Sequence, residues 1–260
     1  MRVPLYQVDA FTDRLFGGNP AAVCPLEAWL PDATMQAIAA ENNLAETAFF
    51  VRDGEDCLLR WFTPAVEVDL CGHATLAAAH IIFRFLEPGR TEVRFRTLKA
   101  GTLTVTRAGD RLVMDFPSRP AIPVPPPPGL VEALGGTPRE ILRARDHLIV
   151  YDSAAEVAAL APDLAALARV DCWAAIVTAP GTDVDFVSRF FAPAQGVAED
   201  PATGSSHCTL VPYWAKRLGK NELEARQLSR RIGSLRGTLD GDRVRLAGGA
   251  VLYLEGQITI

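Results

Sequence analysis

The sequence lacks any apolar run long enough to cross a membrane as a helix. No stretch approaches the roughly 18 uninterrupted apolar residues that a transmembrane helix needs. The N-terminal residues MRVPLYQVDAF go directly into an alternating strand pattern and contain no signal-peptide core. We therefore expect a cytoplasmic protein with no membrane partner.

An excess of basic residues is also missing. The net charge is −5, whereas proteins that bind nucleic acid usually concentrate lysine and arginine. The one short basic cluster, RQLSRR at residues 226–231, follows glutamates and is typical of a solvated face. A nucleic-acid partner is not expected.

Cysteine is sparse and irregularly spaced. The five cysteines, at positions 24, 57, 71, 172 and 208, form an odd set without paired spacing, which favours free thiols in a reducing compartment. The spacing of familiar zinc sites is absent from the nearest candidates, which are Cys71, His73, His207 and Cys208. Phosphate-binding loops, dinucleotide fingerprints, nucleophile elbows and EF-hands are absent too. We expect no metal and no cofactor.

Proline is concentrated at the middle of the chain. Seven of the twelve residues in PSRPAIPVPPPP, residues 117–128, are proline. This density excludes a helix or a central strand and is typical of a stiff extended linker. We expect an N-terminal half of residues 1–118 and a C-terminal half of residues 119–260.

The two halves resemble each other in sequence. RWFTPA at 60–65 matches RFFAPA at 189–194, and Cys71-Gly72 then aligns with Thr203-Gly204 at an offset of 132. The same offset sets GTL at 101–103 against GSL at 233–235. An ordered series at nearly constant spacing predicts two copies of one unit of about 130 residues, related by a pseudo-twofold axis.

Each copy is expected to be mostly β-strand with one buried helix. Alternating runs such as LTVTRAGDRLVMDF, with its Gly-Asp turn, predict hairpins. DATMQAIAAEN at 32–42 predicts a short helix behind an aspartate cap. ATLAAAHIIFRFL at 74–86 and SHCTLVPYWAKRL at 206–218 are apolar almost all round, which predicts helices buried against their sheets. The predicted fold class is α+β, duplicated.

The repeat places Cys71-Gly72-His73 and Thr203-Gly204-Ser205 at equivalent positions, each just before an apolar helix. A helix N-terminus offers unpaired N–H groups and the positive end of the helix dipole, so it favours an anion. Two such ends facing each other across a cleft would hold a small carboxylate-bearing substrate. The alternative is that the two glycines serve only the backbone geometry of a turn.

Four ordered segments carry a resemblance to a known family. They are DAFTDRLFGGNPAAV, NNLAETAFF, FTPAVEVDLCGHATLAAA and FFAPAQGVAEDPATGSSHCTL. Together they resemble the PhzF-like family, named after the phenazine biosynthesis isomerase and sharing the diaminopimelate epimerase fold. The resemblance implies two pseudo-symmetric domains, each a curved, mostly antiparallel sheet around a central helix. It also implies an active site between the domains, a homodimer and cofactor-free proton transfer.

Residue by residue, the resemblance places the acid/base glutamate of the family at Glu46 and its active-site histidine at His73. The aspartate and serine of EDPATGS fall on Asp200 and Ser205. Glu46, His73 and Asp200 are therefore the expected catalytic residues. The expected substrate-binding residues are Asn19, Cys71, Gly72, Thr203, Gly204 and Ser205.

The residues themselves leave alternatives for each role. Glu46 interrupts an apolar strand start, where burial would raise its pKa, but it could also be an exposed strand-end carboxylate. The repeat sets Trp173 opposite Glu46, so the acid belongs to one half only, which favours a one-base proton shuttle. His73 could be a core histidine, and Asp200 could be a helix cap.

Cys71 bears on the choice of mechanism. Two-base epimerases of this fold use two cysteines, one at each helix start, whereas this sequence has Cys71 and Thr203 there. Threonine is too weak an acid to partner a thiolate. We therefore predict an isomerase that moves a proton through Glu46. A racemase, epimerase or dehydratase using Cys71 and a non-catalytic binder of a small acid or a protein are the alternatives.

Overall fold

The computed structural model describes residues 1–260, which form two compact units. The first unit comprises Met1–Asp115 and Ala247–Ile260, and the second comprises Phe116–Leu246. The sequence-based division at 118/119 differs from this one at the C-terminus, because the last strand belongs to the first unit. No helix of the chain is long and apolar enough to span a bilayer.

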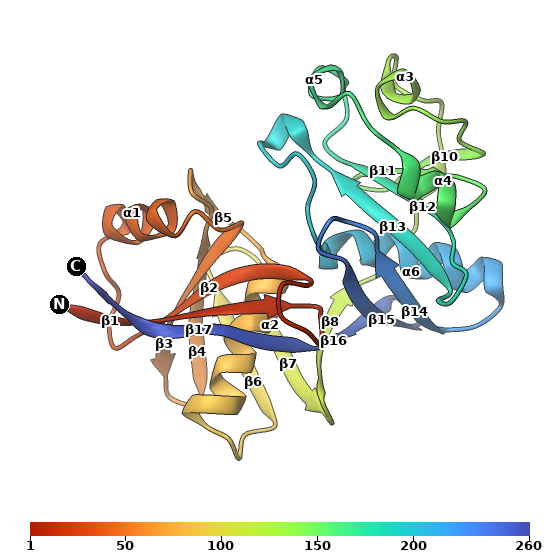
Figure 1. Ribbon diagram of the computed structural model, residues 1–260. Coiled ribbons are helices and arrows are strands. Elements are labelled where there is room, and N and C mark those ends of the chain that lie inside the picture. The colour runs from red at the N-terminus through yellow and green to blue at the C-terminus, as the bar shows by residue number, and fades with distance from the viewer. The chain divides into compact units, whose positions relative to one another are not determined.

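The elements of the first unit follow the chain to the linker and then include the last strand (Figure 1). Its strands are β1 (Arg2–Ala10), β2 (Asn19–Leu26), β3 (Glu46–Asp53), β4 (Asp56–Phe62), β5 (Glu67–Val68), β6 (Glu92–Thr97), β7 (Thr102–Ala108), β8 (Arg111–Pro117), which runs to the second unit, and β17 (Ala250–Thr259). Its helices are α1 (Asp32–Asn42) and α2 (Gly72–Ile81), and α2 continues as a π-helical turn over Ile82–Leu86.

The second unit contains the remaining elements. Its strands are β9 (Ile122–Pro123), β10 (Glu140–Arg143), β11 (His147–Val150), β12 (Ala175–Pro180), β13 (Phe186–Phe191), β14 (Glu222–Gln227), β15 (Gly233–Asp240) and β16 (Arg243–Gly248), which leads back to the first unit. Its helices are α3 (Leu130–Leu134), α4 (Ala154–Ala159), α5 (Leu164–Leu167) and α6 (Gly204–Leu218), with a 3₁₀ turn at Pro193–Gln195.

Strand pairing follows the same order in both units. In the first, β2 and β3 are parallel, β3 and β4 antiparallel, β4 and β6 parallel, and β6 and β7 antiparallel. In the second, β11, β12, β13, β14 and β15 repeat this alternation of parallel and antiparallel neighbours. The duplicated α+β fold predicted from the sequence is confirmed, with β2 corresponding to β11 and α2 to α6.

An outer strand of the first unit comes from the C-terminal end of the sequence. β17 pairs antiparallel with β1 over most of its length, from Arg2 opposite Thr259 to Ala10 opposite Ala250. In the second unit, β9 from the proline-rich segment pairs antiparallel with β10. The strand after β8 therefore joins the second unit, and the strand after β16 joins the first.

The long helices are buried, as their apolar composition predicts. In α2, Ala74, Ala77, Ala78 and Ala79 have no exposed surface. Small side chains all round a helix let strands approach it closely, so α2 packs against β1, β2 and β3. In α6, the buried side chains include Leu210, Val211 and Trp214, whereas the last turn is exposed.

A proline inside α6 connects the helix to the linker. Pro212 has no N–H, so the carbonyl of Cys208, one turn earlier, loses its helical partner. The backbone N–H of Arg119 donates to that carbonyl at 2.8 Å. The segment predicted as a stiff linker is thus held on α6 by a hydrogen bond that the helix cannot make for itself.

The aspartate cap predicted for α1 is wrong. Pro31 occupies the N-cap position, and no side chain caps the helix. Asp32 lies one residue too far along, and its carboxylate accepts a hydrogen bond from the Arg60 guanidinium at 2.9 Å. In the second unit, the equivalent Asp163 does cap α5, since its carboxylate accepts from the Ala166 N–H.

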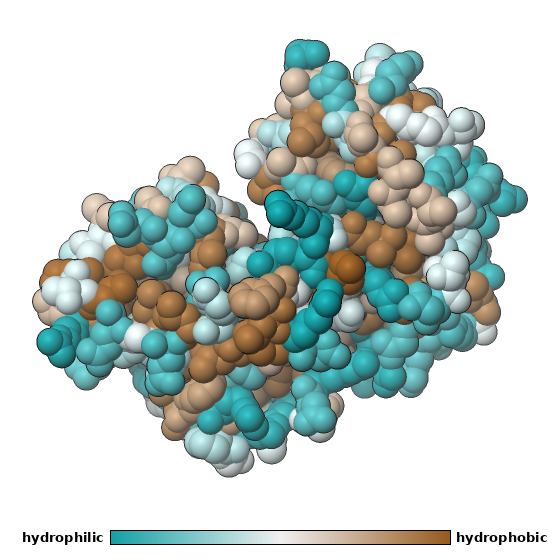
Figure 2. Space-filling view, in the orientation of Figure 1, coloured by the Kyte–Doolittle hydropathy of each residue, from teal (hydrophilic) through white to brown (hydrophobic).

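Apolar side chains remain exposed around β17. Phe16 is 66% exposed and Tyr253 is 48% exposed, and their rings meet edge to face with centroids 5.7 Å apart. Figure 2 shows hydrophobic residues at the surface of the first unit in the region of β17. A patch of this kind on the edge of a sheet is a candidate contact surface.

Candidate active site

Four of the residues predicted for the site meet where α2 begins. His73, near the start of α2, lies with Nε2 3.2 Å from Oε2 of Glu46, the first residue of β3. Asn19, the first residue of β2, approaches Nδ1 of His73 with its side-chain nitrogen at 3.1 Å. The Cys71 sulfur lies 3.5 Å from the same Nδ1. The imidazole is therefore bracketed by a carboxylate, an amide and a thiol.

The fold explains why these side chains converge. β2 and β3 are parallel neighbours, and Ala21 is the register partner of Glu46, so Asn19 and Glu46 stand at the same end of the sheet. Cys71, the N-cap residue of α2, has an extended backbone. The helix then begins at Gly72 and presents His73 to the strand starts. The His73 side chain is 7% exposed and that of Glu46 is 19% exposed, and Oε2 of Glu46 is buried.

The pKa of Glu46 lies below its ordinary value, not above it as the sequence predicted. Burial alone would raise this pKa, but the positive charge of His73 and hydrogen bonds from His73 and Cys71 outweigh burial. His73 shows the converse balance. Burial lowers its pKa, whereas the charges and hydrogen bonds of Cys71 and Glu46 raise it well above the ordinary value. Glu46 is therefore a carboxylate in the resting protein.

Cys71 is a thiol at neutral pH. Burial and the neighbouring Glu46 charge raise its pKa to about 11, although His73 and the Ala74 N–H oppose that rise. Only the Glu46 carboxylate can then supply negative charge to His73 at neutral pH, so the pair that matters is Glu46 with His73. To act as a base, Cys71 would first have to lose its thiol proton, which burial and the Glu46 charge oppose.

The predicted residues of the second unit gather at the start of α6. Thr203 is the N-cap residue, and its hydroxyl donates to Oδ2 of Asp200. The Thr203 side chain itself makes no capping bond to α6. Gly204 is buried, whereas Ser205 is partly exposed on the first turn. Asp200, Thr203, Gly204 and Ser205 therefore form a local cluster within the second unit.

One residue of this cluster was missed by the sequence analysis. Gln227, the last residue of β14, is fully buried and its side chain bonds to both Thr203 and Asp200. It belongs to no recognised motif and lies 24 residues from Thr203 in sequence. Only the fold brings them together, so no sequence signal could have found it.

His207 has a structural role in α6. Its Nδ1 lies 2.8 Å from the Thr203 carbonyl oxygen, and the ring packs near Phe186. Burial lowers its pKa to about 4, although the Thr203 carbonyl opposes the shift. His207 is therefore neutral at physiological pH.

Glu46, Cys71 and His73 are the residues that could hold a metal ion. Each offers one ligand atom, and these atoms all lie within 4.8 Å of one another. Metal ligands must be deprotonated, so an ion would have to displace the thiol proton of Cys71 and a proton from His73. Because Cys71 and His73 are protonated, these three residues suit proton transfer better than binding of a metal ion.

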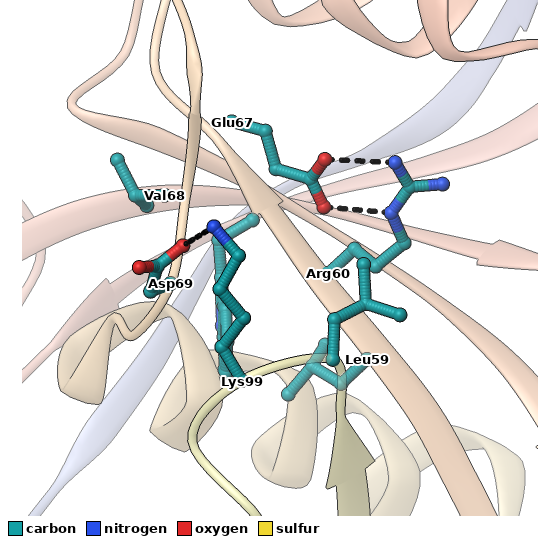
Figure 3. Close-up of a pocket in the computed structure, with 8 residues that line it drawn as sticks. Leu59, Arg60, Glu67, Val68, Asp69 and Lys99 are labelled. Carbon is teal, nitrogen blue, oxygen red and sulfur yellow. Dashed lines mark hydrogen bonds and ion pairs between the residues drawn. The ribbon is translucent and has the colours of Figure 1, made fainter.

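A separate small pocket of about 70 Å³ lies beside the segment that leads to α2. Figure 3 shows its charged side chains turned toward one another. Arg60 donates two hydrogen bonds to the Glu67 carboxylate, and Lys99 pairs with Asp69 at 2.9 Å. These pairs fix β5 and the residues just before Cys71, so this pocket supports the helix start.

The acid is present in one unit only. Trp173, which the repeat sets opposite Glu46, lies just before β12 and is 53% exposed. The guanidinium of Arg145 lies 5.8 Å from the centre of its ring. The second unit thus has an aromatic residue where the first has a carboxylate.

A duplicated α+β fold with an acid, an imidazole and a thiol at one helix start defines a protein of epimerase-like architecture. A solved structure of a probable proline racemase from Agrobacterium radiobacter shares this fold at a TM-score of 0.66 and 9% identity, covering 99% of this chain and 93% of that one. The family model described as phenazine biosynthesis-like protein matches residues 8–256. The chain belongs to this PhzF family.

Similar proteins agree with this assignment. An uncharacterised isomerase of Pseudomonas aeruginosa is 53% identical over 259 residues, with 99% of each chain covered. The crystal structure of a PhzF-family protein from Enterococcus faecalis has a TM-score of 0.97 and 44% identity, covering both chains fully. The resemblance predicted from the sequence motifs is confirmed, and the protein is an enzyme of the isomerase class.

Proposed function

We propose that this protein is a cofactor-independent isomerase that moves a proton between two carbons of a small carboxylic acid, with Glu46 as the acid/base. The observation that carries the proposal is the ion pair of Glu46 with His73. A general base must be unprotonated before it acts, and His73 holds Glu46 in that form.

His73 also suits the step in which charge moves. When Glu46 takes a proton from carbon, its own charge disappears and a negative charge develops on the substrate. Because Glu46 is then neutral, the His73 imidazolium no longer has a charged partner there, and it stabilises the negative charge on the substrate. Returning the proton to a second carbon restores the pair. One carboxylate therefore serves as base and then as acid.

The two helix starts are proposed to bind the substrate carboxylate, in a cleft between the units. N–H groups in the first turns of α2 and α6 have no helical acceptor, and neither helix has a side-chain cap bond. By contrast, Ser153 caps α4 and Asp163 caps α5. Gly72 and Gly204 open the two uncapped helices. Asp200 and Ser205 are proposed to bind the amino or hydroxyl group and the carboxylate of the substrate.

The test is Glu46→Gln, which removes the acid/base function and keeps the shape. Small carboxylic acids are incubated with the protein in D₂O, and deuterium at carbon is followed by NMR and mass spectrometry. We expect exchange to fall roughly 10²- to 10⁴-fold in the variant, with the melting temperature nearly unchanged. Glu41→Gln, an exposed carboxylate on α1, is the matched control. Full exchange in Glu46→Gln would contradict the proposal.

The same assay separates the racemase alternative. The Cys71 sulfur lies close to His73, so a thiol-dependent exchange at the α-carbon is geometrically accessible. Exchange that is lost in Cys71→Ala and retained in Glu46→Gln would establish Cys71 as the base. Loss in Glu46→Gln alone supports the one-base isomerase.

The homodimer expected from the resemblance stays a prediction. Two copies would have twice the 28.1 kDa mass of the chain, which light scattering measures directly. The exposed residues Phe16 and Tyr253 offer a contact surface, because apolar side chains on a sheet edge lose unfavourable hydration when covered. A monomer at micromolar concentration would contradict the prediction.

A further inference from the structure

We propose that Gln227 is a positioning residue that directs the hydroxyl proton of Thr203 onto Asp200 and so fixes the Asp200 carboxylate for substrate. The inference rests on the proposed function only in giving Asp200 a role toward substrate. The hydrogen-bond relay itself is a property of the second unit.

The side chain of Gln227 uses both of its ends. Its Oε1 accepts the backbone N–H of Thr203 at 2.8 Å. Its Nε2 donates to the backbone carbonyl of Asp200 at 2.7 Å and to the Thr203 hydroxyl oxygen at 3.1 Å. Gln227 has no exposed surface, so water does not compete for these bonds. A buried amide satisfied in this way is held in one orientation.

Backbone groups determine which way the amide points. A backbone N–H can only donate and a backbone carbonyl can only accept. The Thr203 N–H therefore requires the oxygen of Gln227, and the Asp200 carbonyl requires its nitrogen. The reversed amide would place two donors together at one end and two acceptors together at the other.

This orientation sets the direction of the hydroxyl bond. The Thr203 hydroxyl has one proton, and its oxygen already accepts from Nε2 of Gln227. Its proton is then free to go to Oδ2 of Asp200, with which it makes a short hydrogen bond. The relay runs in one direction, from amide to hydroxyl to carboxylate.

The loop that carries Asp200 is fixed by further contacts to β15 and to the segment that connects β14 with β15. The hydroxyl of Ser229 donates to the Pro201 carbonyl at 2.8 Å. A side chain at Gly233 would come within 2.6 Å of the Ala202 Cβ atom, so the strand and the loop are in close contact there. These contacts hold the backbone, whereas the relay reaches the carboxylate itself. Gln227 therefore does more than anchor the loop.

The test is a double-mutant cycle between Thr203→Val and Asp200→Asn, read by the exchange assay. Thr203→Val keeps the shape and removes the hydroxyl. We expect a kcat loss of roughly 10- to 100-fold with a smaller change in KM, because the carboxylate is misplaced and not lost. In the Asp200→Asn background, Thr203→Val should have little further effect, since it acts through Asp200. Thr203→Ser, which restores the hydroxyl, should recover most of the activity.

Gln227→Met tests the start of the relay, with Gln195→Met on the exposed 3₁₀ turn as the matched control. We expect Gln227→Met to reproduce the kcat loss of Thr203→Val and the control to behave as wild type. Additive losses in the cycle, or equal activity of Thr203→Val and Thr203→Ser, would overturn the proposal. Glu46→Gln is measured in parallel, because its retained activity sinks the proposed function and leaves the coupling within the cycle intact.

Discussion

Glu46 and His73 stabilise each other's charged forms inside a site where burial opposes both charges. The geometry that achieves this is one contact of 3.2 Å between Nε2 of His73 and Oε2 of Glu46. A buried pair of this kind is sensitive to the loss of either partner, because the remaining charge has no compensation. Each pKa therefore reflects a balance between burial and the charge of the partner.

Replacing His73 should reverse the pKa shift of Glu46. Without the imidazolium, burial is the dominant influence, so His73→Gln should move the pKa of Glu46 from below its ordinary value to above it. A ¹³C NMR titration of the labelled glutamate carboxyls measures both values without requiring activity. A Glu46 pKa that stays low in His73→Gln would contradict the assigned ion pair.

The same pair links stability to pH. Glu46, with a lowered pKa, contributes stability that is present above its unfolded pKa and is lost as pH falls through the folded value. His73, with a raised pKa, contributes stability below its unfolded pKa that is lost as pH rises through the folded value. The wild type should therefore exceed His73→Gln in free energy of unfolding most clearly at mildly acidic pH, as urea denaturation would measure. A constant difference from pH 4 to pH 9 would argue against this linkage.

Cys71 should react slowly with thiol reagents at neutral pH. Its side chain is nearly buried and its pKa is about 11, so little thiolate is present. Because the Glu46 charge contributes to that rise, Glu46→Gln should lower the pKa and speed up alkylation by iodoacetamide. Mass spectrometry of the modified peptide gives both rates. Faster alkylation of Cys71 in the wild type than in Glu46→Gln would refute this expectation.

The motifs predicted which residues form the first cluster, because each motif is short and lies at the end of its own element. They did not predict the direction of the Glu46 pKa. That direction depends on His73, which the parallel pairing of β2 and β3 and the packing of α2 bring into contact with Glu46. Gln227 was missed for the same reason, since its contacts exist only once β14 lies beside the start of α6.

Among the elements, α6 and β15 pack with almost no space between them. A Cβ atom built at Gly237 would collide with a Val211 methyl group. This glycine is therefore required by close approach of strand and helix, not by a turn. It determines how near α6 can come to its sheet.

Gly237→Ala should destabilise the protein by about 1–3 kcal/mol, because the added methyl forces helix and strand apart. Gly89→Ala is the control, since a Cβ atom there meets nothing within 4 Å. Chemical denaturation of both variants gives the difference in free energy of unfolding. Equal stabilities of the two variants would show that α6 can move away at no cost.

Helix positions were predictable because α2 and α6 are long apolar segments that follow glycine. The residues at which helices begin were harder to predict than the helices themselves. The cap of α1 was assigned to an aspartate, but Pro31 takes the capping position and Arg60 takes the carboxylate. The preference for aspartate at a helix start depends only on neighbouring residues. The Arg60 guanidinium that binds the Asp32 carboxylate comes from β4, so a local sequence pattern cannot predict this contact.

For the whole molecule, the pairing of β1 with β17 brings the chain ends together, which makes a circular permutant possible. Met1 and Ile260 are joined by hydrogen bonds at the ends of β1 and β17, so the two termini are adjacent. The proline-rich segment 124–128 contains no strand or helix. Linking the termini and opening the chain between Pro126 and Pro127 should leave every strand pair intact.

This circular permutant is expected to fold with a melting temperature within a few degrees of the wild type, because the opened segment lies outside the regular structure. A permutant opened between Ala77 and Ala78, inside the buried α2, is the control and should fail to fold. Calorimetry and circular dichroism distinguish the two. Loss of folding in both would mean that the linker itself is essential.

For the whole molecule, the sequence repeat predicted the duplication but not the return of β17 to the first unit. Matched motifs align α2 with α6, and they align the β7–β8 segment with the β15–β16 segment. β9 and β17 share no such motif. β9 is a two-residue strand in a proline-rich segment, whereas β17 is long. The division at 118/119 stays a prediction, and in the structure residues 247–260 group with the first unit.

The pairing of β1 with β17 also determines how the molecule responds to force. Both chain ends lie at the same end of an antiparallel pair, with Arg2 opposite Thr259. Tension applied between the termini would therefore load the ladder's hydrogen bonds one after another and not all at once. The first unit should open like a zipper at low force while the second unit, inserted between β8 and β16, is still folded. Pulled by its ends, this protein yields first at the unit that carries Glu46.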